Sequence, residues 1–226
     1  MTAARRPAET GRAAAAYVDV MLLRMLRVAA ATALLTGCIV DRDADRPAAP
    51  SAERPERWAP EAGGIVGLWI DWAGGTPGWR PEFASLVADA ADLWNAAGAP
   101  IRFVRVDSPD AARVWVHWRR WQPGAERGTT TRQLNARGEI VAADVTIILA
   151  PGLARPVSSP SELRAIALHE LGHALGLPHD PSRAAIMYWQ LGAPRLTDRD
   201  RDVLRATYRA ALPPPRRAPV SAAGVR

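Results

Sequence analysis

The chain has 226 residues, enough for one domain with a sizeable core, and carries a formal net charge of +6. Its excess of arginine lies before Cys38 and after Leu212, and the body between these residues is neutral. A neutral body excludes a phosphate-binding surface as the main function. Arg119 and Arg120 are typical of a solvated strand end, with a local patch beside Trp118 and Trp121 as the alternative. The single cysteine excludes an intramolecular disulfide, so the core alone must stabilise the fold. A nucleic-acid partner is therefore not expected, and the chain is expected to be a monomer.

The front of the chain has the pattern of a bacterial lipoprotein signal peptide. Arg24 and Arg27 precede an apolar stretch, Val28–Leu35, which is followed by small residues and Cys38. This order is typical of a signal peptide whose cleavage leaves a lipidated cysteine at the start of the mature chain. The apolar run is too short for a membrane-spanning helix, which needs about 20 residues. We expect residues 1–37 to be the signal peptide and Cys38 to be the lipid anchor.

Two features of this front leave alternatives open. Glu9 and Asp19 suit the start of a signal peptide poorly, so translation from Met21 or Met25 is an alternative start. A buried core thiol is the alternative role for Cys38.

The organisation after the anchor follows from composition and periodicity. Residues 38–62 are rich in proline, alanine, arginine and acids, which is typical of a flexible tether. Residues 63–212 are expected to form one folded domain, and residues 213–226 a disordered tail. The polar run Gln122–Gly138 is expected to be a loop or a loose hairpin. The other predicted elements, in chain order, are a strand at Ile65–Trp72, a helix at Pro81–Ala97, strands at Ile101–Val106, Val114–Trp118 and Ile140–Leu149, a helix that begins after Ser159, and a last helix that begins at Thr197.

The run HELGHALGLPH has the spacing of a zinc site with a glutamate beside it. Residues four apart lie on the same face of a helix, so His169 and His173 can bind one ion while Glu170 projects next to them. Gly176 lets the chain turn, and His179 can then supply a third ligand. Three protein ligands are typical of a catalytic zinc, because structural sites use four.

The residue types in this run predict hydrolysis of an amide bond. Zinc bound to neutral imidazoles lowers the pKa of its water to about 7. Glu170 is the natural general base, which takes the proton of that water and passes it to the leaving amine. The alternative is a buried helix whose histidines only satisfy hydrogen bonds.

The motif, together with Ala185-Ile186-Met187-Tyr188, resembles the metzincin zinc proteases, whose signature HExxHxxGxxH is followed by a turn with a methionine under the metal. Met187 lies eight residues after His179, and this short connection is similar to the matrixin branch. The resemblance covers about residues 63–211. It implies an α+β fold with a twisted, mostly parallel sheet, an antiparallel edge strand, an active-site helix, a Met-turn and a C-terminal helix. It also implies that an extended peptide substrate adds to the edge strand.

The resemblance also bears on the residues around the motif. Met187 is expected to form the floor of the site, with ordinary core packing as a compatible role. Tyr188 and Trp189 are substrate-pocket candidates or core residues. Trp189 stands where astacins carry a tyrosine ligand, so no tyrosine ligand is expected. Cys38 lacks the surroundings of a matrixin prodomain cysteine.

Other metal sites have little support in the sequence. His117 is the one histidine outside the motif, so a second structural zinc is not expected. His117 is read as an ordinary sheet histidine, with substrate contact as the alternative. Calcium through acids such as Asp71 or Asp144 stays possible, although no ligand spacing favours it.

The sequence thus predicts a zinc endopeptidase of the bacterial cell envelope, with a protein or peptide substrate and a lipid anchor in the membrane. Ile39 stands where an aspartate would favour retention in the inner membrane, so the outer membrane is preferred, and secretion is the alternative. A non-catalytic, zinc-stabilised scaffold lipoprotein is the alternative function, and a peptidase of narrow specificity is a third.

Overall fold

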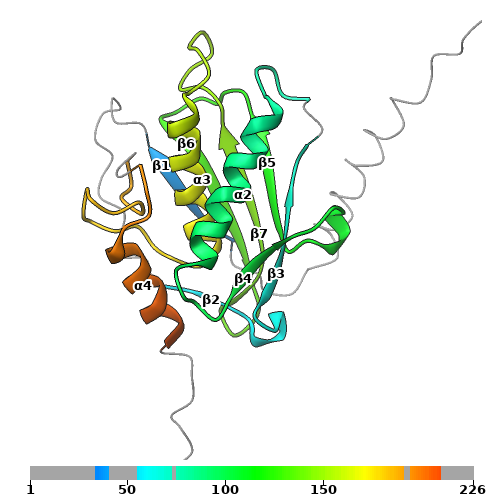
Figure 1. Cartoon of the computed structure of the whole chain (residues 1–226), viewed down its shortest axis with the longest axis vertical. Coiled ribbons are helices and arrows are strands. Elements are labelled where there is room, and N and C mark those ends of the chain that lie inside the picture. Colours follow the sequence, from blue (N-terminus) through cyan, green and yellow to red (C-terminus); the bar gives the residue numbers. More distant parts are fainter. Residues whose placement is uncertain (1–33, 41–54, 73–74, 191–193, 210–226) are drawn as a thin grey trace, which may run out of the picture. The chain divides into compact units, whose positions relative to one another are not determined.

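A computed structural model describes residues 34–40, 55–72, 75–190 and 194–209 (Figure 1). The described elements belong to one compact unit, which begins at Leu34. Most of the predicted signal peptide, residues 41–54 of the predicted tether, and the predicted tail lie outside the described residues. Within the described part of the chain, no helix has the length and apolar character needed to cross a bilayer.

A seven-stranded sheet forms the centre of the domain, in the order β1-β6-β7-β5-β3-β4, with β2 also paired to β7. Strands β3, β4, β5 and β7 are parallel to one another, whereas β6 is antiparallel to β7 and β1 is antiparallel to β6. The strands are β1 (Leu34–Val40), β2 (Arg57–Trp58), β3 (Ile65–Ile70), β4 (Arg102–Arg105), β5 (Val114–Arg119), β6 (Glu126–Leu134) and β7 (Glu139–Ile148).

Three α-helices accompany the sheet in the described residues, namely α2 (Pro81–Asn95), α3 (Pro160–Ala174) and α4 (Asp198–Arg209). Figure 1 shows α2 and α3 side by side on one face of the sheet. Short 3-10 turns are η1 (Pro60–Ala62) and η2 (Pro109–Ala111). The mostly parallel sheet, its antiparallel strand and these helices confirm the predicted α+β fold.

The core lies between this face of the sheet and the two helices. Alternate residues of the central strands are buried, as the period of two requires, and they pack against the buried face of α2. Trp94 of α2 adds a specific bond, because its Nε1 donates to the carbonyl oxygen of Leu168 in α3 at 2.8 Å. The helix that carries the zinc motif is therefore held at a fixed position over the sheet.

The prediction of a loop over Gln122–Gly138 is wrong for its central part, which is the nine-residue strand β6, whereas the alternative prediction of a hairpin agrees with the pairing of β6 and β7. The hairpin to β7 is closed by a turn in which Gly138 N donates to Asn135 O. The strand has a polar sequence because its inward residues contact polar groups of α3 rather than an apolar layer. Because these inward residues are polar, the segment lacks the alternation of apolar and polar residues by which a strand is recognised.

The expected tether is also ordered in its last part. Trp58 is only 4% exposed, and its Nε1 donates to Ala174 O at 2.9 Å. Glu56 N donates to Gly176 O at 2.9 Å, and β2 pairs with the beginning of β7. The folded region thus begins before residue 63, because a buried tryptophan anchors residues 56–58 to the end of α3.

Strand β1 spans the expected boundary between signal peptide and mature chain. It pairs with β6 along its whole length, with Gly37 opposite Thr130 and Ile39 opposite Gly128. The antiparallel strand β6 therefore has a further strand beside it.

Candidate active site

The helix α3 starts where the capping residues of the sequence place it. Ser159 Oγ accepts from Glu162 N at 3.3 Å, and the Glu162 carboxylate accepts from Ser159 N at 2.8 Å. From Ala165 onward every residue of the helix is buried. A helix buried on all sides is rigid, which suits it to hold ligand side chains in place.

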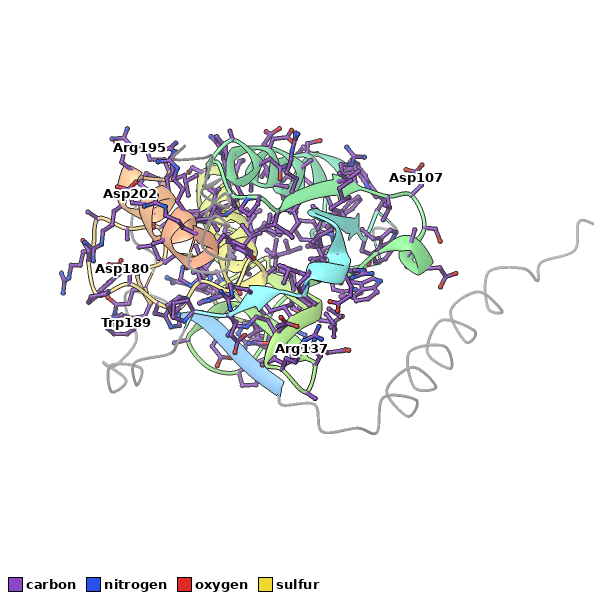
Figure 2. All side chains as sticks on the ribbon, turned by 90° about the horizontal axis from the view of Figure 1, so that it is seen from below. Asp107, Arg137, Asp180, Trp189, Arg195 and Asp202 are labelled. Atoms are coloured by element: carbon purple, nitrogen blue, oxygen red, sulfur yellow. The ribbon has the colours of Figure 1, made fainter. Side chains whose placement is uncertain are left out.

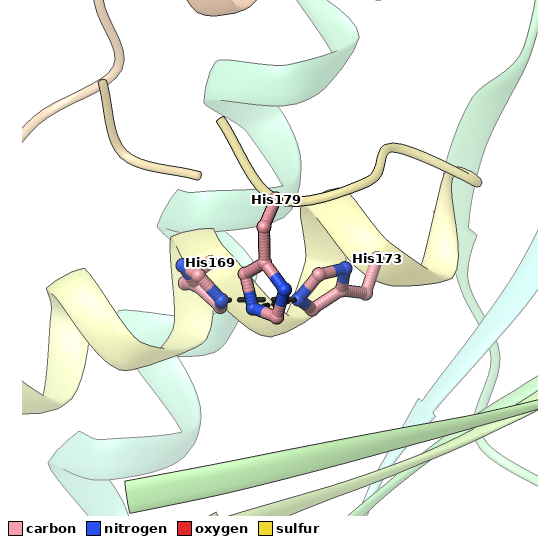
Figure 3. A group of neighbouring side chains, drawn as sticks. All are labelled: His169, His173 and His179. Carbon is pink, nitrogen blue, oxygen red and sulfur yellow. Dashed lines mark hydrogen bonds between the residues drawn. The ribbon is translucent and has the colours of Figure 1, made fainter. Parts of the chain in front are cut away.

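Three side chains of the motif converge at the C-terminal half of this helix. Figure 3 shows the rings of His169 and His173 on α3 facing His179, which comes from the loop that follows. The His173 Nε2 atom lies 3.0 Å from His169 Nε2 and 3.3 Å from His179 Nε2. Among the residues that the structure describes, this is the one group with the geometry of a metal site. The structure therefore brings together the three ligands that the spacing predicts.

The other ring nitrogens show that this donor set fits a cation. His169 Nδ1 lies 2.7 Å from Ile186 O, and His173 Nδ1 lies 2.8 Å from Leu177 O. Since a carbonyl only accepts, both Nδ1 atoms carry the proton, and in neutral rings the two Nε2 atoms are then acceptors. Two acceptors 3.0 Å apart repel each other unless a cation lies between them. Nitrogen ligands of this kind suit zinc.

The electrostatic environment keeps two of these rings neutral. Burial lowers the pKa of His169 to about 3, and the neighbouring His179 adds to the effect. Burial also lowers the pKa of His173 well below its usual range, assisted by His169, His179 and the charge of Arg132. Neutral imidazole is the form that binds a metal, so protons do not compete for these ligands at pH 7.

A glycine turn brings His179 back to the helix. Gly176 has φ 90°, in the left-handed region, and its N–H donates to His173 O at 2.8 Å. Leu177 N donates to Gly172 O at 3.0 Å and completes the end of the helix. A Cβ at Gly176 would lie 2.2 Å from Glu56 O, so this position has no room for a side chain. Glycine is required here for both conformation and space.

Side chains from three other elements satisfy the carbonyls at the end of α3. Arg132 of β6 donates from Nη1 to His173 O at 3.0 Å, and Trp58 of β2 donates to Ala174 O. Tyr208 of α4 donates from its hydroxyl to Leu175 O at 2.9 Å. Arg132 also pairs through Nε with Glu56 at 2.8 Å. The carbonyls that a helix leaves unpaired at its end are thus used to fix the ligand helix to its surroundings.

Glu170 is completely buried beside the histidines, on the side of β6. The Thr130 hydroxyl lies 2.6 Å from Glu170 Oε2 and 3.0 Å from Glu170 O. A Cβ at Gly128 would lie 2.6 Å from Glu170 Oε1. The carboxylate is therefore in close contact with the backbone and one hydroxyl of β6.

The predicted Met-turn lies beneath the helix. Met187 is 2% exposed, and a Cβ at Gly172 would lie 2.3 Å from its sulfur. The absence of a side chain at Gly172 thus lets Met187 pack directly on α3. This position agrees with the prediction that Met187 forms the floor of the metal site. Asp200 of α4 accepts hydrogen bonds from Ile186 N and Met187 N and so holds the turn from below.

The sequence model of the matrixin family matches residues 89–209, more than half of the chain, and includes the motif and the Met-turn. The chain belongs to the matrixin family. A search of curated proteins found no match. Membership in this family of peptidases, together with the histidine group, supports a zinc metallopeptidase type of function.

The structure of this matrixin separates the two substrate-pocket candidates. Tyr188 is buried, and the guanidinium of Arg183 lies 6.0 Å from the centre of its ring. Trp189 is half-buried against Tyr188 and lies at the periphery of the domain, on the same side as Asp180 (Figure 2). Asp180 pairs with Arg199 of α4 at 2.8 Å. Tyr188 is therefore the more buried of the two candidates, and Trp189 is the more accessible one.

His117 is not brought to the site of this matrixin. It lies on β5 between the inward residues Val116 and Trp118, so its side chain is on the other face of the sheet. There it is 3.8 Å from Asp144, and burial lowers its pKa. The geometry agrees with a sheet histidine rather than with substrate contact.

Sequence reasoning did not single out the residues that support the matrixin motif. Gly128, Thr130 and Arg132 occupy every second position of β6. This period of two is typical of one face of a strand, but it does not stand out in the sequence because none of the three residues is a large apolar one. Glu56 lay in a segment that reads as a tether, and the signal there was the neighbouring tryptophan. Asp200 lies in the first turn of α4, where acidic residues are common in any helix, so its position did not indicate a contact with the Met-turn.

Proposed function

We propose that this matrixin is a zinc-dependent endopeptidase that hydrolyses peptide bonds with Glu170 as general base. The observation that carries the proposal is the set of three Nε2 atoms that face one another, with two Nδ1 protons bound to carbonyls. His169, His173 and His179 would hold the zinc. The metal supplies Lewis acidity, which activates water and polarises the substrate carbonyl.

The residues of the chain would transfer the proton and orient the metal ligands. Glu170 follows the first ligand directly and lies beside it, so it can take a proton from the attacking water and deliver it to the leaving amine. Its complete burial keeps bulk water away from the carboxylate. The carbonyls of Ile186 and Leu177 orient the two histidines of the helix, as is common for metal-binding imidazoles.

The strand β6 is proposed to bind the substrate along the backbone edge that does not pair with β7. Support comes from β1, which pairs with this edge over seven residues in the antiparallel direction. The pairing extends to both sides of Gly128 and Thr130, the two residues in contact with Glu170. An edge that accommodates an extended chain on both sides of the base favours cleavage inside a chain over removal of terminal residues.

Replacement of Glu170 by glutamine tests the mechanism. The variant Glu170→Gln should bind zinc in the same stoichiometry as the wild type and should not cleave a library of unstructured peptides, because the amide cannot accept the proton. Glu82→Gln, which changes an exposed glutamate of α2, is the matched control and should cleave like the wild type. Full cleavage by Glu170→Gln would exclude this mechanism. Zinc binding by a wild type that cleaves no peptide would instead favour the non-catalytic scaffold lipoprotein.

We further propose that Cys38 is lipidated and tethers the enzyme to the cell envelope, with the outer membrane preferred. The support is the sequence order of arginines, apolar stretch and cysteine at the front of the chain. Mass spectrometry of the protein from the membrane fraction tests this proposal. A mature chain that begins at Cys38 with added acyl mass is expected, and a chain without acyl mass would exclude the anchor.

A further inference from the structure

The inward face of β6 contacts the functional residues of α3 at every second position. A Cβ at Gly128 would lie 2.6 Å from a carboxylate oxygen of Glu170, the Thr130 hydroxyl contacts the other oxygen, and Arg132 donates to His173 O. The alternation follows from the strand, since residues two apart project to the same side. One strand thus contacts both the proposed base and a proposed ligand.

The contact between Thr130 and Glu170 is the shortest of these. The hydroxyl has a single proton, and the separation of 2.6 Å from Oε2 is that of a hydrogen bond to a charged carboxylate. Its second contact, at 3.0 Å, is to the main-chain oxygen of the same residue. The hydroxyl therefore touches both ends of Glu170 and restricts the torsions between them.

Gly128 completes this restriction on the other side of the carboxylate. A Cβ at this position would lie 2.6 Å from Oε1 and 2.7 Å from Cγ of Glu170. The glutamate side chain therefore occupies the space that any other residue at 128 would fill. Because β6 and α3 are both buried here, the carboxylate cannot move away without displacing one of them.

We propose that Thr130 is a positioning residue for Glu170, which holds the carboxylate of the base in its working orientation. The inference rests on the proposed peptidase function. Orientation of a reacting group is worth large factors in rate when the group has several rotatable bonds.

The test compares Thr130→Val with Thr130→Ser and with a matched control. Thr146→Val makes the same replacement on β7, at a half-buried position on the face of the sheet away from α3. Thr130→Val should lower kcat about 10- to 100-fold with KM within about twofold and with unchanged zinc content. Thr130→Ser should recover kcat to within a few-fold, and Thr146→Val should leave both constants unchanged. Wild-type kcat in Thr130→Val, or no recovery in Thr130→Ser, would overturn the proposal.

A double-mutant cycle in unfolding makes the test independent of activity. Thr130→Val and Glu170→Ala are measured singly and together by urea denaturation of the full chain. Their effects should be non-additive by about tenfold in the unfolding constant, because each change removes the same contact. Additive effects would overturn the contact itself. If the contact is present but the wild type hydrolyses no peptide, the proposed function fails and not the contact.

A separate observation concerns the edge of β6. The segment Leu34–Val40 of the same chain already occupies it, with Gly37 and Ile39 opposite the two residues that contact Glu170. The Cα atoms of β1 also approach α3. The backbone groups that a peptide substrate would pair with are therefore engaged by the chain itself.

We propose that β1 blocks the substrate edge of β6 until the segment is withdrawn. This too rests on the proposed function. Cleavage before Cys38 would remove four of the seven paired residues, so processing of the chain would also open this edge of β6 to a substrate.

Two full-length variants without the cysteine test the block. Cys38→Ser prevents processing and keeps the backbone N–H of residue 38, whereas Cys38→Pro/Ile39→Pro prevents processing and breaks the pairing. The double variant should have a KM at least about tenfold lower for an unstructured peptide, at equal zinc content. Its backbone amides in β6 should also exchange with solvent faster. Equal KM, or equal exchange, would overturn the block. Failure of both variants to cleave, with exchange altered as expected, would count against the peptidase function.

Discussion

Gly176 is the position at which one added methyl group tests the structure most directly. Replacement by alanine forces a residue with a Cβ to adopt φ 90°, which costs about 1–2 kcal/mol. The new Cβ would also lie 2.2 Å from Glu56 O and 2.7 Å from Glu56 C, which are backbone atoms and cannot rotate away. The two segments must therefore separate by about 1 Å.

That separation weakens identifiable bonds. The hydrogen bond from Glu56 N to Gly176 O is lost, at about 1 kcal/mol, and the neighbouring pair between Glu56 and Arg132 is stretched. We expect Gly176→Ala to lower the free energy of unfolding by about 2–3 kcal/mol through these two costs, with the weaker Glu56–Arg132 pair adding to the loss. Since His179 follows the turn, zinc affinity should fall as well.

The control is Gly138→Ala, which has a similar φ of 74° but no atom within 4 Å of the added Cβ. Its free energy of unfolding should fall only by the cost of the left-handed conformation, about 1–2 kcal/mol, and it should bind zinc like the wild type. Urea unfolding with and without zinc, together with a competition titration for zinc, measures both effects. Equal losses of stability in the two variants would refute the reasoning, because the contact with Glu56 would then have no energetic consequence.

Three further results are expected. Asp200→Asn replaces the carboxylate that accepts from the backbone N–H groups of the Met-turn with an amide, and it should lower the free energy of unfolding by about 3 kcal/mol. Zinc binding, measured by competition, should also weaken. Unchanged values of both would contradict the support of the turn by Asp200. Burial raises the pKa of Tyr208, so the folded state keeps a proton that the unfolded chain loses above pH about 10. Stability should therefore fall as pH rises above that value, by up to about 1.4 kcal/mol per pH unit, and Tyr208→Phe should abolish this slope in alkaline unfolding curves. Removal of zinc by a chelator should lower Tm, because the metal binds only the folded site, and re-addition should restore it; a Tm independent of zinc would argue against a metal at the histidines.

The parts of the site that the sequence predicts are those whose chemistry requires fixed spacing. His169, His173 and His179 are set by one helical turn and one glycine turn, and the capping box at Ser159 independently marks the start of the helix. Hydrophobic periodicity likewise locates the central strands, because they are buried on a face that packs against helices. These are local or strongly patterned features, which sequence alone can carry.

The parts that escaped prediction depend on contacts between distant segments. Thr130 lies forty residues from Glu170, and its polar neighbours give β6 the composition of a loop. Trp58 and Glu56 lie in a proline-rich segment, and only the position of α3 reveals that they are anchors. A polar residue that pairs with one buried partner leaves no periodic signal, so such residues become visible only in the folded structure.

The anchoring of residues 56–58 at the end of α3 also has a consequence for the proposed lipid anchor. If Cys38 is held in the bilayer as proposed and β1 is withdrawn from β6, eighteen residues lead from Cys38 to Glu56, and a chain of that length spans at most about 60 Å. The same segment supports the helix α3, because Trp58 donates a hydrogen bond to Ala174 O at its end. The catalytic domain would therefore work within a shallow layer above the lipid surface, and the polypeptides that enter this layer would be its substrates.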